Sequence, residues 1–315
     1  MNDSDLPGPP RIQIQTQAGC NGRCVFCPNE EILRSGLPHG KMNVTLFRKI
    51  IDELALTNPR RISLYLQNEP VNDKRLPELV RYVADRVPHA ATLVTSNGTK
   101  LTEAVTEALI RAGLQRLKIS LQSLDPETNR RIMGYSSERV IENVLGAKKV
   151  ADRLGANHFD LRVSMVVTNI NAEEIARARR FWRKHGVRLV TSALENRGGN
   201  IEDADGMNLG GMRRRRDCIR PYREMCVLYN GDVILCCVDW HRTVVLGNLE
   251  NQSIREVWNG PRLAEIRRAF KNGDENNLPE ICMNCTESAC PDSHRRSLKT
   301  FLKRFITPVS SPRRR

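Results

Sequence analysis

The stretch Cys20-Asn-Gly-Arg-Cys24-Val-Phe-Cys27 places three cysteines at C-x3-C-x2-C spacing near the N-terminus. The alternating run Arg11-Ile-Gln-Ile-Gln-Thr-Gln17 comes just before it and predicts a strand that leads into the cysteine loop. Three thiolates from one loop can bind three irons of a cubic iron–sulfur cluster. The fourth iron would then lack a protein ligand, so the motif indicates a place where a substrate or cofactor binds.

Other interpretations of the cysteine loop fit the sequence less well. Structural zinc usually takes two C-x2-C pairs or mixtures of Cys and His, and neither a His nor a fourth Cys lies close by, so zinc stays the main alternative. A disulfide framework would imply secretion, but the chain opens Met-Asn-Asp-Ser-Asp without an apolar signal segment. The ten cysteines form an early group of three and a group of seven after residue 217, which favours metal binding in a cytoplasmic protein.

Size and charge limit the possible functions. With 315 residues, 40% of them hydrophobic, the chain can form one large domain or one large and one small domain. No run of about 18 apolar residues is present, so we expect no membrane span. The net charge of +14 is partly local, in Arg213–Arg216 and Arg313–Arg315. Solvated loops and a tail explain these arginines, and nucleic-acid binding is the alternative. The 5% content of aromatic residues argues against base stacking.

Strand and helix patterns alternate through about residue 200. Six such units imply parallel strands with right-handed crossovers, in a doubly wound sheet or a partial barrel. Ligands bind at the carboxyl ends of the strands in both folds, so the cysteine loop should lie there. The expected strands are 11–17, 61–66, 92–95, 117–121, 159–167 and 187–193, and the expected helices are 44–54, 76–86, 102–112, a stretch after Asp125-Pro126, 139–154 and 172–185.

Polar residues gather at the ends of these strands. Each could serve a turn, but together, opposite a cysteine loop, they predict a cofactor site. They are Gln67-Asn68-Glu69-Pro70, Thr95-Ser96-Asn97-Gly98, Ser120 with Gln122, Arg162 with Ser164, and Glu195-Asn196-Arg197-Gly198-Gly199-Asn200.

The cysteine motif, its position after the first strand and the six units resemble the radical S-adenosylmethionine (radical SAM) superfamily over residues 10–200. The resemblance implies an α/β fold, a partial (β/α)6 TIM-like barrel. It also implies a [4Fe–4S] cluster on Cys20, Cys24 and Cys27, with S-adenosylmethionine at the open iron. In that family one electron cleaves the cofactor to a 5′-deoxyadenosyl radical, which abstracts a hydrogen from the substrate. A flavodoxin- or ferredoxin-type protein would supply the electron.

The resemblance also assigns cofactor contacts. Phe26 would pack near the adenine, and Glu69 would bind the methionine amino group, although Gln67-Asn68 replaces the two glycines of the family's Gly-Gly-Glu motif. Ser120 and Gln122 would lie near the ribose. Arg162 or Ser164 would contact the carboxylate or the ribose of the cofactor. Residues from Leu194 to Asn196 would lie beside the adenine.

The second half carries another cysteine series. A hairpin is expected over Val227–Leu235 with its turn at Asn230-Gly231. Cys218, Cys236 and the C-x2-C pair Cys282 and Cys285 would suit a zinc site as a generic interpretation. The pattern also resembles the SPASM/twitch extension of radical SAM enzymes, a small α+β unit. The resemblance, in its twitch form, implies a second [4Fe–4S] cluster held by Cys218, Cys236, Cys282 and Cys285.

Three cysteines remain after these assignments: Cys226, Cys237 and Cys290. Most such residues are small core side chains. A thiol that faces the site could instead return a hydrogen atom to a substrate radical, as in radical epimerases, and Cys226 is our candidate. Cys237 should alternate with Cys236 on one strand and so face away from the auxiliary cluster. Cys290 could replace a cluster ligand.

The sequence therefore predicts four parts: a tail over 1–9, the barrel over 10–205, the auxiliary-cluster domain over 206–296, and a basic helix and tail over 297–315. The expected function is oxidation or epimerisation of a small polar substrate (a sugar, aminocyclitol or nucleotide-linked sugar) in antibiotic biosynthesis. The basic charge favours a phosphorylated or nucleotide-linked substrate. Alternatives are a peptide-modifying maturase, a sugar dehydratase or decarboxylase, a C–C bond-forming enzyme and, from another class, a nucleic-acid-binding iron–sulfur protein. No peptide-recognition domain fits before residue 20, which disfavours the maturase.

Overall fold

A computed structural model describes residues 6–201, 203–214 and 218–288. The expected tail helix over 297–315, Cys290 and Arg313–Arg315 lie outside these residues. The strands are β1 Arg11–Ile14, β2 Arg61–Ser63, β3 Ala91–Ser96, β4 Arg116–Ser120, β5 Asp160–Val167, β6 Arg188–Ala193, β7 Met212–Arg214, β8 Glu224–Val227, β9 Asp232–Ile234, β10 Val245–Asn248 and β11 Thr286–Ser288. The α-helices are α1 Asn29–Arg34, α2 Val44–Ala55, α3 Leu76–Arg86, α4 Glu103–Arg111, α5 Pro126–Met133, α6 Glu138–Arg153, α7 Ile175–Lys184, α8 Ala204–Met207, α9 Ile254–Trp258, α10 Pro261–Asn272 and α11 Glu280–Met283.

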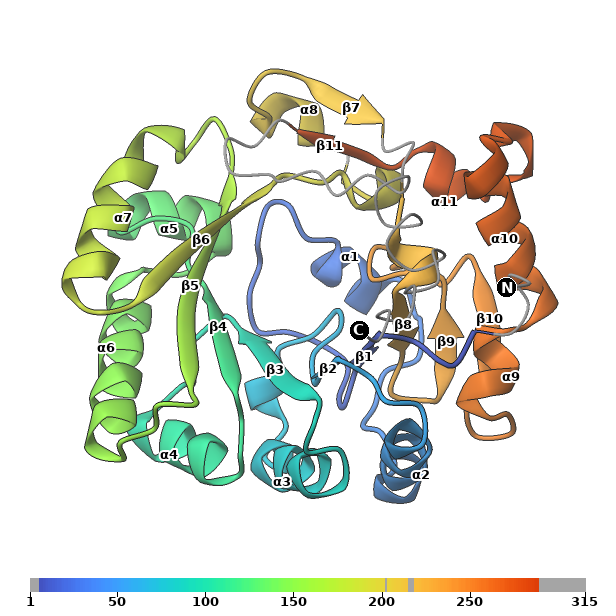
Figure 1. Cartoon of the computed structure of the whole chain (residues 1–315). Helices are drawn as coiled ribbons and strands as arrows, with labels where there is room; N and C mark the ends of the chain where they lie inside the picture. The colour runs from blue at the N-terminus through green and yellow to red at the C-terminus, as the bar shows by residue number, and fades with distance from the viewer. Residues whose placement is uncertain (1–5, 202, 215–217, 289–315) are drawn as a thin grey trace, which may run out of the picture.

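One curved sheet of nine strands forms the centre, in the order β10-β9-β8-β1-β2-β3-β4-β5-β6. Strands β1 to β6 pair in parallel, and the intervening helices cover the outside of the curve (Figure 1). The predicted partial α/β barrel is therefore confirmed. The small antiparallel pair β7 and β11 lies above the open side of the curve, next to α8 and α11 (Figure 1).

The barrel separates an apolar outer layer from a polar inner one because side chains alternate along each strand. Strand β5 shows this clearly: Leu161, Val163, Met165 and Val167 are buried, whereas the residues between them are half-buried. Helix α2 supplies the matching apolar face, and the side chain of Asn43 caps it by accepting from the Thr45 N–H. The core thus lies between strands and helices and leaves the inside of the barrel for polar groups.

The expected C-terminal extension continues the barrel sheet. Strand β8 pairs in parallel with β1, with Arg11 opposite Glu224, and β9 and β10 follow antiparallel. The hairpin turn at Asn230-Gly231 forms as predicted, but β9 ends at Ile234. Strand β1 is therefore an inner strand, between β2 and β8.

Candidate active site

The cysteine loop follows β1 and leads into α1. The end of α5 holds it through two main-chain hydrogen bonds: Arg23 N–H donates to the Met133 carbonyl at 3.2 Å, and Val25 N–H to the Ile132 carbonyl at 2.9 Å. Gly134 ends α5 in the left-handed conformation (φ 82°), and a Cβ there would lie 3.1 Å from that of Arg23. Close approach of the two segments therefore fixes the loop that carries the thiols.

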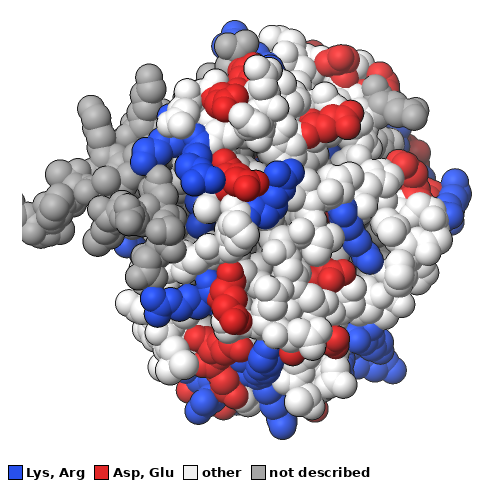
Figure 2. Space-filling model, turned by 90° about the vertical axis from the view of Figure 1, so that its right-hand side faces the viewer, with Lys and Arg blue, Asp and Glu red and all other residues white. Residues whose placement is uncertain are grey.

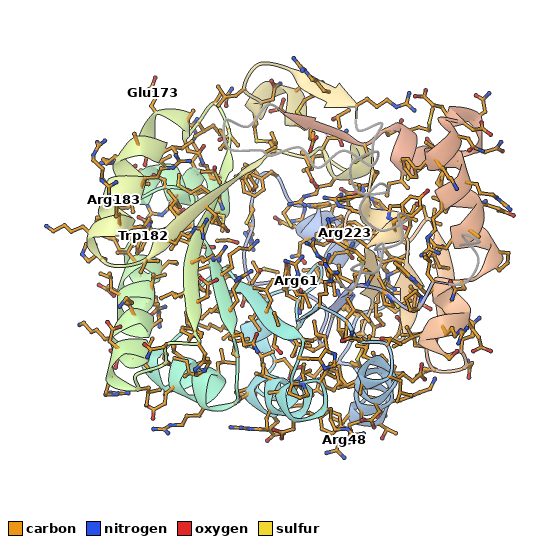
Figure 3. All side chains as sticks on the ribbon, in the orientation of Figure 1. Arg48, Arg61, Glu173, Trp182, Arg183 and Arg223 are labelled. Carbon is orange, nitrogen blue, oxygen red and sulfur yellow. The ribbon has the colours of Figure 1, made fainter. Side chains whose placement is uncertain are left out.

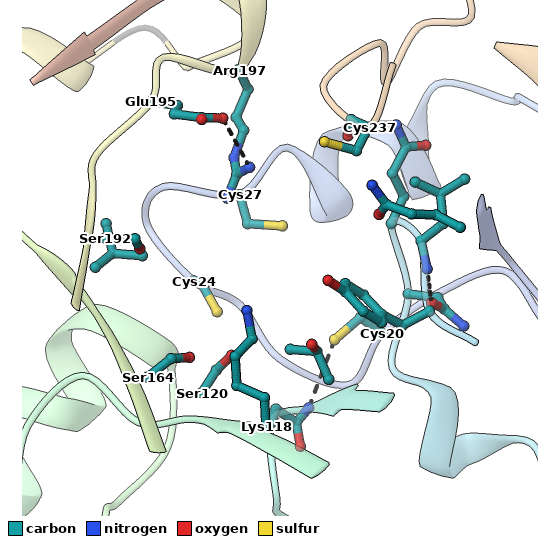
Figure 4. A pocket seen from close by; sticks show the side chains of 18 of the residues that line it. Cys20, Cys24, Cys27, Lys118, Ser120, Ser164, Ser192, Glu195, Arg197 and Cys237 are labelled. Carbon is teal, nitrogen blue, oxygen red and sulfur yellow. Dashed lines mark hydrogen bonds and ion pairs between the residues drawn. The ribbon is translucent and has the colours of Figure 1, made fainter. Parts of the chain in front are cut away.

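The three thiols of this loop open into one cavity of about 450 Å³ inside the barrel. Figure 4 shows Cys20, Cys24 and Cys27 around its rim, with β4 and β5 below them. The Asn97 amide lies 3.7 Å from the Cys20 sulfur, and the Gly22 N–H lies 3.3 Å from it. The cavity extends along the inside of the barrel from the start of β1 and β2 to the carboxyl ends of the strands, where the sequence predicts the thiols.

The donor set fits an iron–sulfur cluster. Burial raises the pKa of Cys20 to about 11, and it also raises the pKa of Cys24 and of Cys27, so each buried thiol needs a cationic partner to ionise. No three Cys, His, Asp or Glu side chains of the described ranges converge on a single-ion position. A cubic cluster does not need that convergence because each thiolate binds a different iron.

Glu69 lies beside this loop at the bend after β2. It is 2% exposed, and its carboxylate accepts hydrogen bonds from Ser96 Oγ at 2.7 Å, Asn97 N at 2.6 Å and Val71 N at 3.0 Å. Burial raises the pKa of Glu69, and these hydrogen bonds oppose that effect. The Glu69 N–H also donates to the Gly19 carbonyl at 3.0 Å, which ties the bend to the cysteine loop. A buried, oriented carboxylate in the cavity wall can bind an ammonium group.

Gln67 adopts a conformation that non-glycine residues rarely take. Its φ is 50°, in the left-handed region, at the position where the family motif has glycine. Its side-chain amide donates to two carbonyls of a distant turn, Cys237 O at 3.2 Å and Asp239 O at 3.1 Å. The side chain that replaces glycine therefore links the first cysteine site to the C-terminal part of the chain.

The other predicted cofactor contacts divide into two groups. Phe26, Ser120, Gln122 and Ser164 line the cavity, with Leu194 and Glu195 from the segment after β6. Arg162 does not: it lies near the start of β5 and forms an ion pair with Asp160, 2.5 Å from Nη2 to Oδ2.

Asn196 is also absent from the cavity wall. Its side-chain Oδ1 accepts from Gly198 N at 3.1 Å and from Thr286 N at 2.9 Å, and its side-chain Nδ2 donates to the Asn284 carbonyl at 2.7 Å. These bonds fasten the loop after β6 to the segment around α11. The residues next to it in sequence, Glu195 and Arg197, face the cavity instead.

The later cysteines form a second group next to this site. Cys218 precedes the short 3-10 helix Arg220–Tyr222, Cys236 follows β9, Cys282 lies in α11 and Cys285 follows it. The pKa of Cys282 is raised to about 12, mainly by burial and also by the neighbouring thiols of Cys218 and Cys285. Burial also raises the pKa of Cys236, with Cys237 and Cys218 adding to the effect. Four neighbouring, mostly buried thiols suit a fully ligated iron–sulfur cluster.

The remaining cysteines are arranged differently from the prediction. Cys226 is 0% exposed and packs in an apolar cluster with Leu66, Leu228 and Ile234, so it does not reach the cavity. Cys237 does line the cavity, across from Cys27 in Figure 4. The strand alternation assumed for Cys236 and Cys237 is wrong, because β9 ends at Ile234 and both residues lie in a turn.

Glu195 and Arg197 were expected at a polar strand end, but their partner Arg220 was not; the three form a partly buried charge group between the two cysteine sites. Glu195 Oε1 lies 2.6 Å from Arg220 Nη2, and Glu195 Oε2 lies 3.6 Å from Arg197 Nη1. Both arginines line the cavity, and their positive charges offset part of the rise in pKa that burial causes, Arg220 for Cys236 and Arg197 for Cys24. The signal in the sequence was the position of Arg220, two residues after Cys218.

The basic composition does not produce a uniform basic face. In the view of Figure 2, acidic side chains lie among the lysines and arginines. Of the predicted arginine run, Arg213 and Arg214 lie in β7, and the rest falls outside the described residues. Within residues 6–288, gaps excepted, no helix is long and apolar enough to span a membrane.

Comparison with known proteins bears on each part of the chain. The family model of the radical SAM superfamily matches residues 14–181, and that of SPASM, an iron–sulfur cluster-binding domain, matches residues 218–286. The S-adenosyl-L-methionine-dependent 2-deoxy-scyllo-inosamine dehydrogenase of Niallia circulans is 24% identical over 87% of this chain and 91% of its own length. The AdoMet-dependent heme synthase of Methanosarcina barkeri is 30% identical over 54% of this chain and 46% of its own.

Solved structures share the fold. BtrN in complex with AdoMet and 2-DOIA aligns with a TM-score of 0.60 at 20% identity, over 87% of this chain and 92% of that one. Streptococcus suis SuiB bound to precursor peptide SuiA aligns with a TM-score of 0.69 at 18% identity, over 85% and 68%.

The two family models imply three cofactors: a [4Fe–4S] cluster, an auxiliary cluster and S-adenosylmethionine. The superfamily model covers more than half of the sequence, and its range includes the cysteine loop and the bend at Glu69. This chain therefore belongs to the radical SAM superfamily of enzymes.

Proposed function

We propose that this enzyme is an oxidoreductase that removes hydrogen from a small polar substrate, an aminocyclitol or related sugar, in natural-product biosynthesis. The observation that carries the proposal is the cavity of about 450 Å³ into which the three thiols of the N-terminal loop open and which polar strand-end residues help to line. A cavity of that size suits a cofactor with a small ligand. The dehydrogenase from Niallia circulans, which aligns along nearly its whole length, supports this substrate class.

In the proposed assignment, Cys20, Cys24 and Cys27 hold the first cluster, and Cys218, Cys236, Cys282 and Cys285 hold the auxiliary cluster. When bound, S-adenosylmethionine and the reduced first cluster supply a carbon radical that abstracts hydrogen from the substrate. Glu69 binds the amino group of the cofactor through its buried carboxylate. Phe26 packs against the adenine, and the remaining polar contacts come from the strand ends: Ser120, Gln122 and Ser164.

The protein also shields the reaction from water. The cysteine loop, the Gln67–Glu69 bend and the turn at Cys237 surround the cavity, and each is tied to another by hydrogen bonds. A concave site inside the barrel orients the substrate and limits side reactions of a reactive intermediate.

The direct test uses anaerobically reconstituted protein. It should bind about eight irons per chain and, after reduction, convert S-adenosylmethionine to 5′-deoxyadenosine. A panel of deuterated aminocyclitols, sugars and nucleotide sugars should then transfer label into 5′-deoxyadenosine, with the oxidised product formed in equal amount. Absence of cofactor cleavage would refute the proposal, and label transfer only from peptides would favour a maturase.

Epimerisation is the second candidate because Cys237 lies in the cavity wall. Its thiol can give a hydrogen atom to a carbon radical: a C–H bond forms, the S–H bond breaks, and a sulfur radical remains. One electron from a flavodoxin- or ferredoxin-type donor and one proton then restore the thiol. In this case the product carries deuterium from solvent, and Cys237→Ala abolishes that product while cofactor cleavage continues. Cys226→Ala is the matched control because Cys226 is buried outside the cavity.

A further inference from the structure

The floor of the cavity carries charges that the proposed cofactor contacts do not use. Arg11, Arg61 and Glu224 begin the neighbouring strands β1, β2 and β8, and they occupy the same register, with Arg11 opposite both others. Residues in register share one face of a sheet. All three line the cavity, and Figure 3 shows Arg61 in the middle of the barrel, unlike Arg48 or Arg183 at the outside. The floor is therefore a built charged surface.

The Glu224 carboxylate forms ion pairs with both arginines. Glu224 Oε1 lies 3.2 Å from Arg11 Nη1 and 4.0 Å from Arg61 Nη2, and Glu224 Oε2 accepts from Gln13 Nε2 at 3.2 Å. The Nε–H of Arg61 is buried, and among the described residues it has no hydrogen-bond partner. The Arg61 side chain as a whole is 28% exposed, so the end of the guanidinium beyond the buried Nε is open to a ligand in the cavity.

Lys118 adds a further cation. It lies on β4, and Figure 4 shows its side chain extending into the cavity beside Ser120. Within the described part of the chain, no hydrogen bond or ion pair engages its ammonium group. In the cavity wall, Arg11, Arg61 and Lys118 carry three positive charges against the one negative charge of Glu224, and Lys118 lies further along the strands than the two arginines.

We propose that Arg61 and Lys118 bind an anionic group of the substrate, a phosphate ester or a carboxylate. The inference rests on the proposed function and narrows its substrate class. Arg61 offers planar N–H donors that match two oxygens of such a group, and Lys118 offers a mobile point charge. An anion held at the floor leaves the rest of the substrate to extend toward the cysteine loop.

The test is a binding measurement that needs no turnover. Reconstituted holoenzyme saturated with S-adenosylmethionine is titrated anaerobically with inorganic phosphate, pyrophosphate and acetate by calorimetry. We expect binding that weakens with salt. Arg61→Gln and Lys118→Gln should each reduce the affinity by about 10- to 100-fold, and Arg61→Lys should retain part of it. Arg183→Gln, an exposed arginine on α7, is the matched control and should bind as the wild type does.

The outcomes separate this inference from the proposed function. Preference for phosphate or pyrophosphate identifies a phosphorylated substrate, and preference for acetate identifies a carboxylate. Failure of the wild type to bind any of the three, or equal affinity in Arg61→Gln, Lys118→Gln and Arg183→Gln, would overturn the inference. Cofactor cleavage is measured on the same samples. If Arg61→Gln and Lys118→Gln lose anion binding but cleave the cofactor at the wild-type rate, the anion site is supported. If the wild type never cleaves the cofactor, only the proposed function is refuted.

Discussion

Replacement of Gln67 tests how the bend beside the cysteine loop is stabilised. The wild-type side chain makes two hydrogen bonds to main-chain carbonyls, while its backbone stays in the left-handed region at φ 50°. Gln67→Ala removes both hydrogen bonds and keeps the unfavourable backbone. Gln67→Gly removes the same bonds but relieves the backbone, since glycine has no Cβ to clash. The two variants therefore separate the stabilisation by the hydrogen bonds from the cost of the left-handed backbone.

The expected magnitudes follow from these contacts. A net gain of about 0.5–1.5 kcal/mol for each hydrogen bond gives a loss of about 1–3 kcal/mol for Gln67→Ala. Relief of the left-handed conformation returns about 1–2 kcal/mol in Gln67→Gly, less about 0.5–1 kcal/mol for the greater chain entropy of glycine. We therefore expect the glycine variant to be about 1 kcal/mol more stable than the alanine variant.

Anaerobic thermal unfolding measures these differences, with roughly 2 °C expected per kcal/mol for a chain of this size. Asn58 is the matched control because its φ is 54°, its side chain is exposed and the structure gives it no side-chain hydrogen bond. The difference between alanine and glycine should recur there, without the loss due to the hydrogen bonds. The reasoning would be refuted if Gln67→Ala unfolded at the same temperature as the wild type, or if Gln67→Gly unfolded at a lower temperature than Gln67→Ala.

Three other predictions concern separate sites. Cys282→Ala should lower the iron content from about eight to about four per chain while cofactor cleavage persists, and full iron content would remove Cys282 from the ligand set. The raised pKa of Glu69 predicts that affinity for S-adenosylmethionine falls as the pH is lowered from about 8 toward about 4.3, the ordinary pKa of a glutamate, and that the fall begins above that pH because the buried carboxylate takes up a proton at a higher pH than usual. Calorimetry should show a weaker and nearly pH-independent affinity for Glu69→Gln, and an unchanged wild-type affinity over this range would contradict the assignment. Arg267 is fully buried and donates to the carbonyls of Pro221 and Trp258, so Arg267→Met should destabilise the protein by about 3 kcal/mol or more; urea unfolding with an unchanged midpoint would exclude this.

Local patterns in the sequence were enough to predict the barrel. The period-two burial of β5 and the apolar spacing of α2 depend on neighbouring residues, and both formed as expected. Helix α3 has the predicted bounds, Leu76–Arg86. The first cysteine site was predictable because all three thiols belong to one short loop after one strand.

Errors arose where a distant contact decides the position of a side chain. Cys237 faces the cavity because the chain turns directly after β9, and the amide of Gln67, 170 residues earlier in the sequence, binds that turn. Arg162 was assigned to the cofactor from its place on a strand, but Asp160, two residues before it on the same face, pairs with it. The Arg162 error differs in kind, because Asp160 and Arg162 alternate on one strand and their pairing did have a local sequence signal; only the contact of Gln67 with the turn had none.

The pairing of β1 with β8 has a consequence for synthesis of the chain. Arg11 leaves the ribosome 213 residues before Glu224, its partner across the sheet. At about 5–20 residues per second, β1 waits roughly 10–40 s with one edge unpaired. An open strand edge invites pairing with other chains. Folding of the first half therefore stays incomplete until the second cysteine region begins to emerge, and a nascent chain that stalls before residue 224 should be prone to aggregation and a natural client for chaperones.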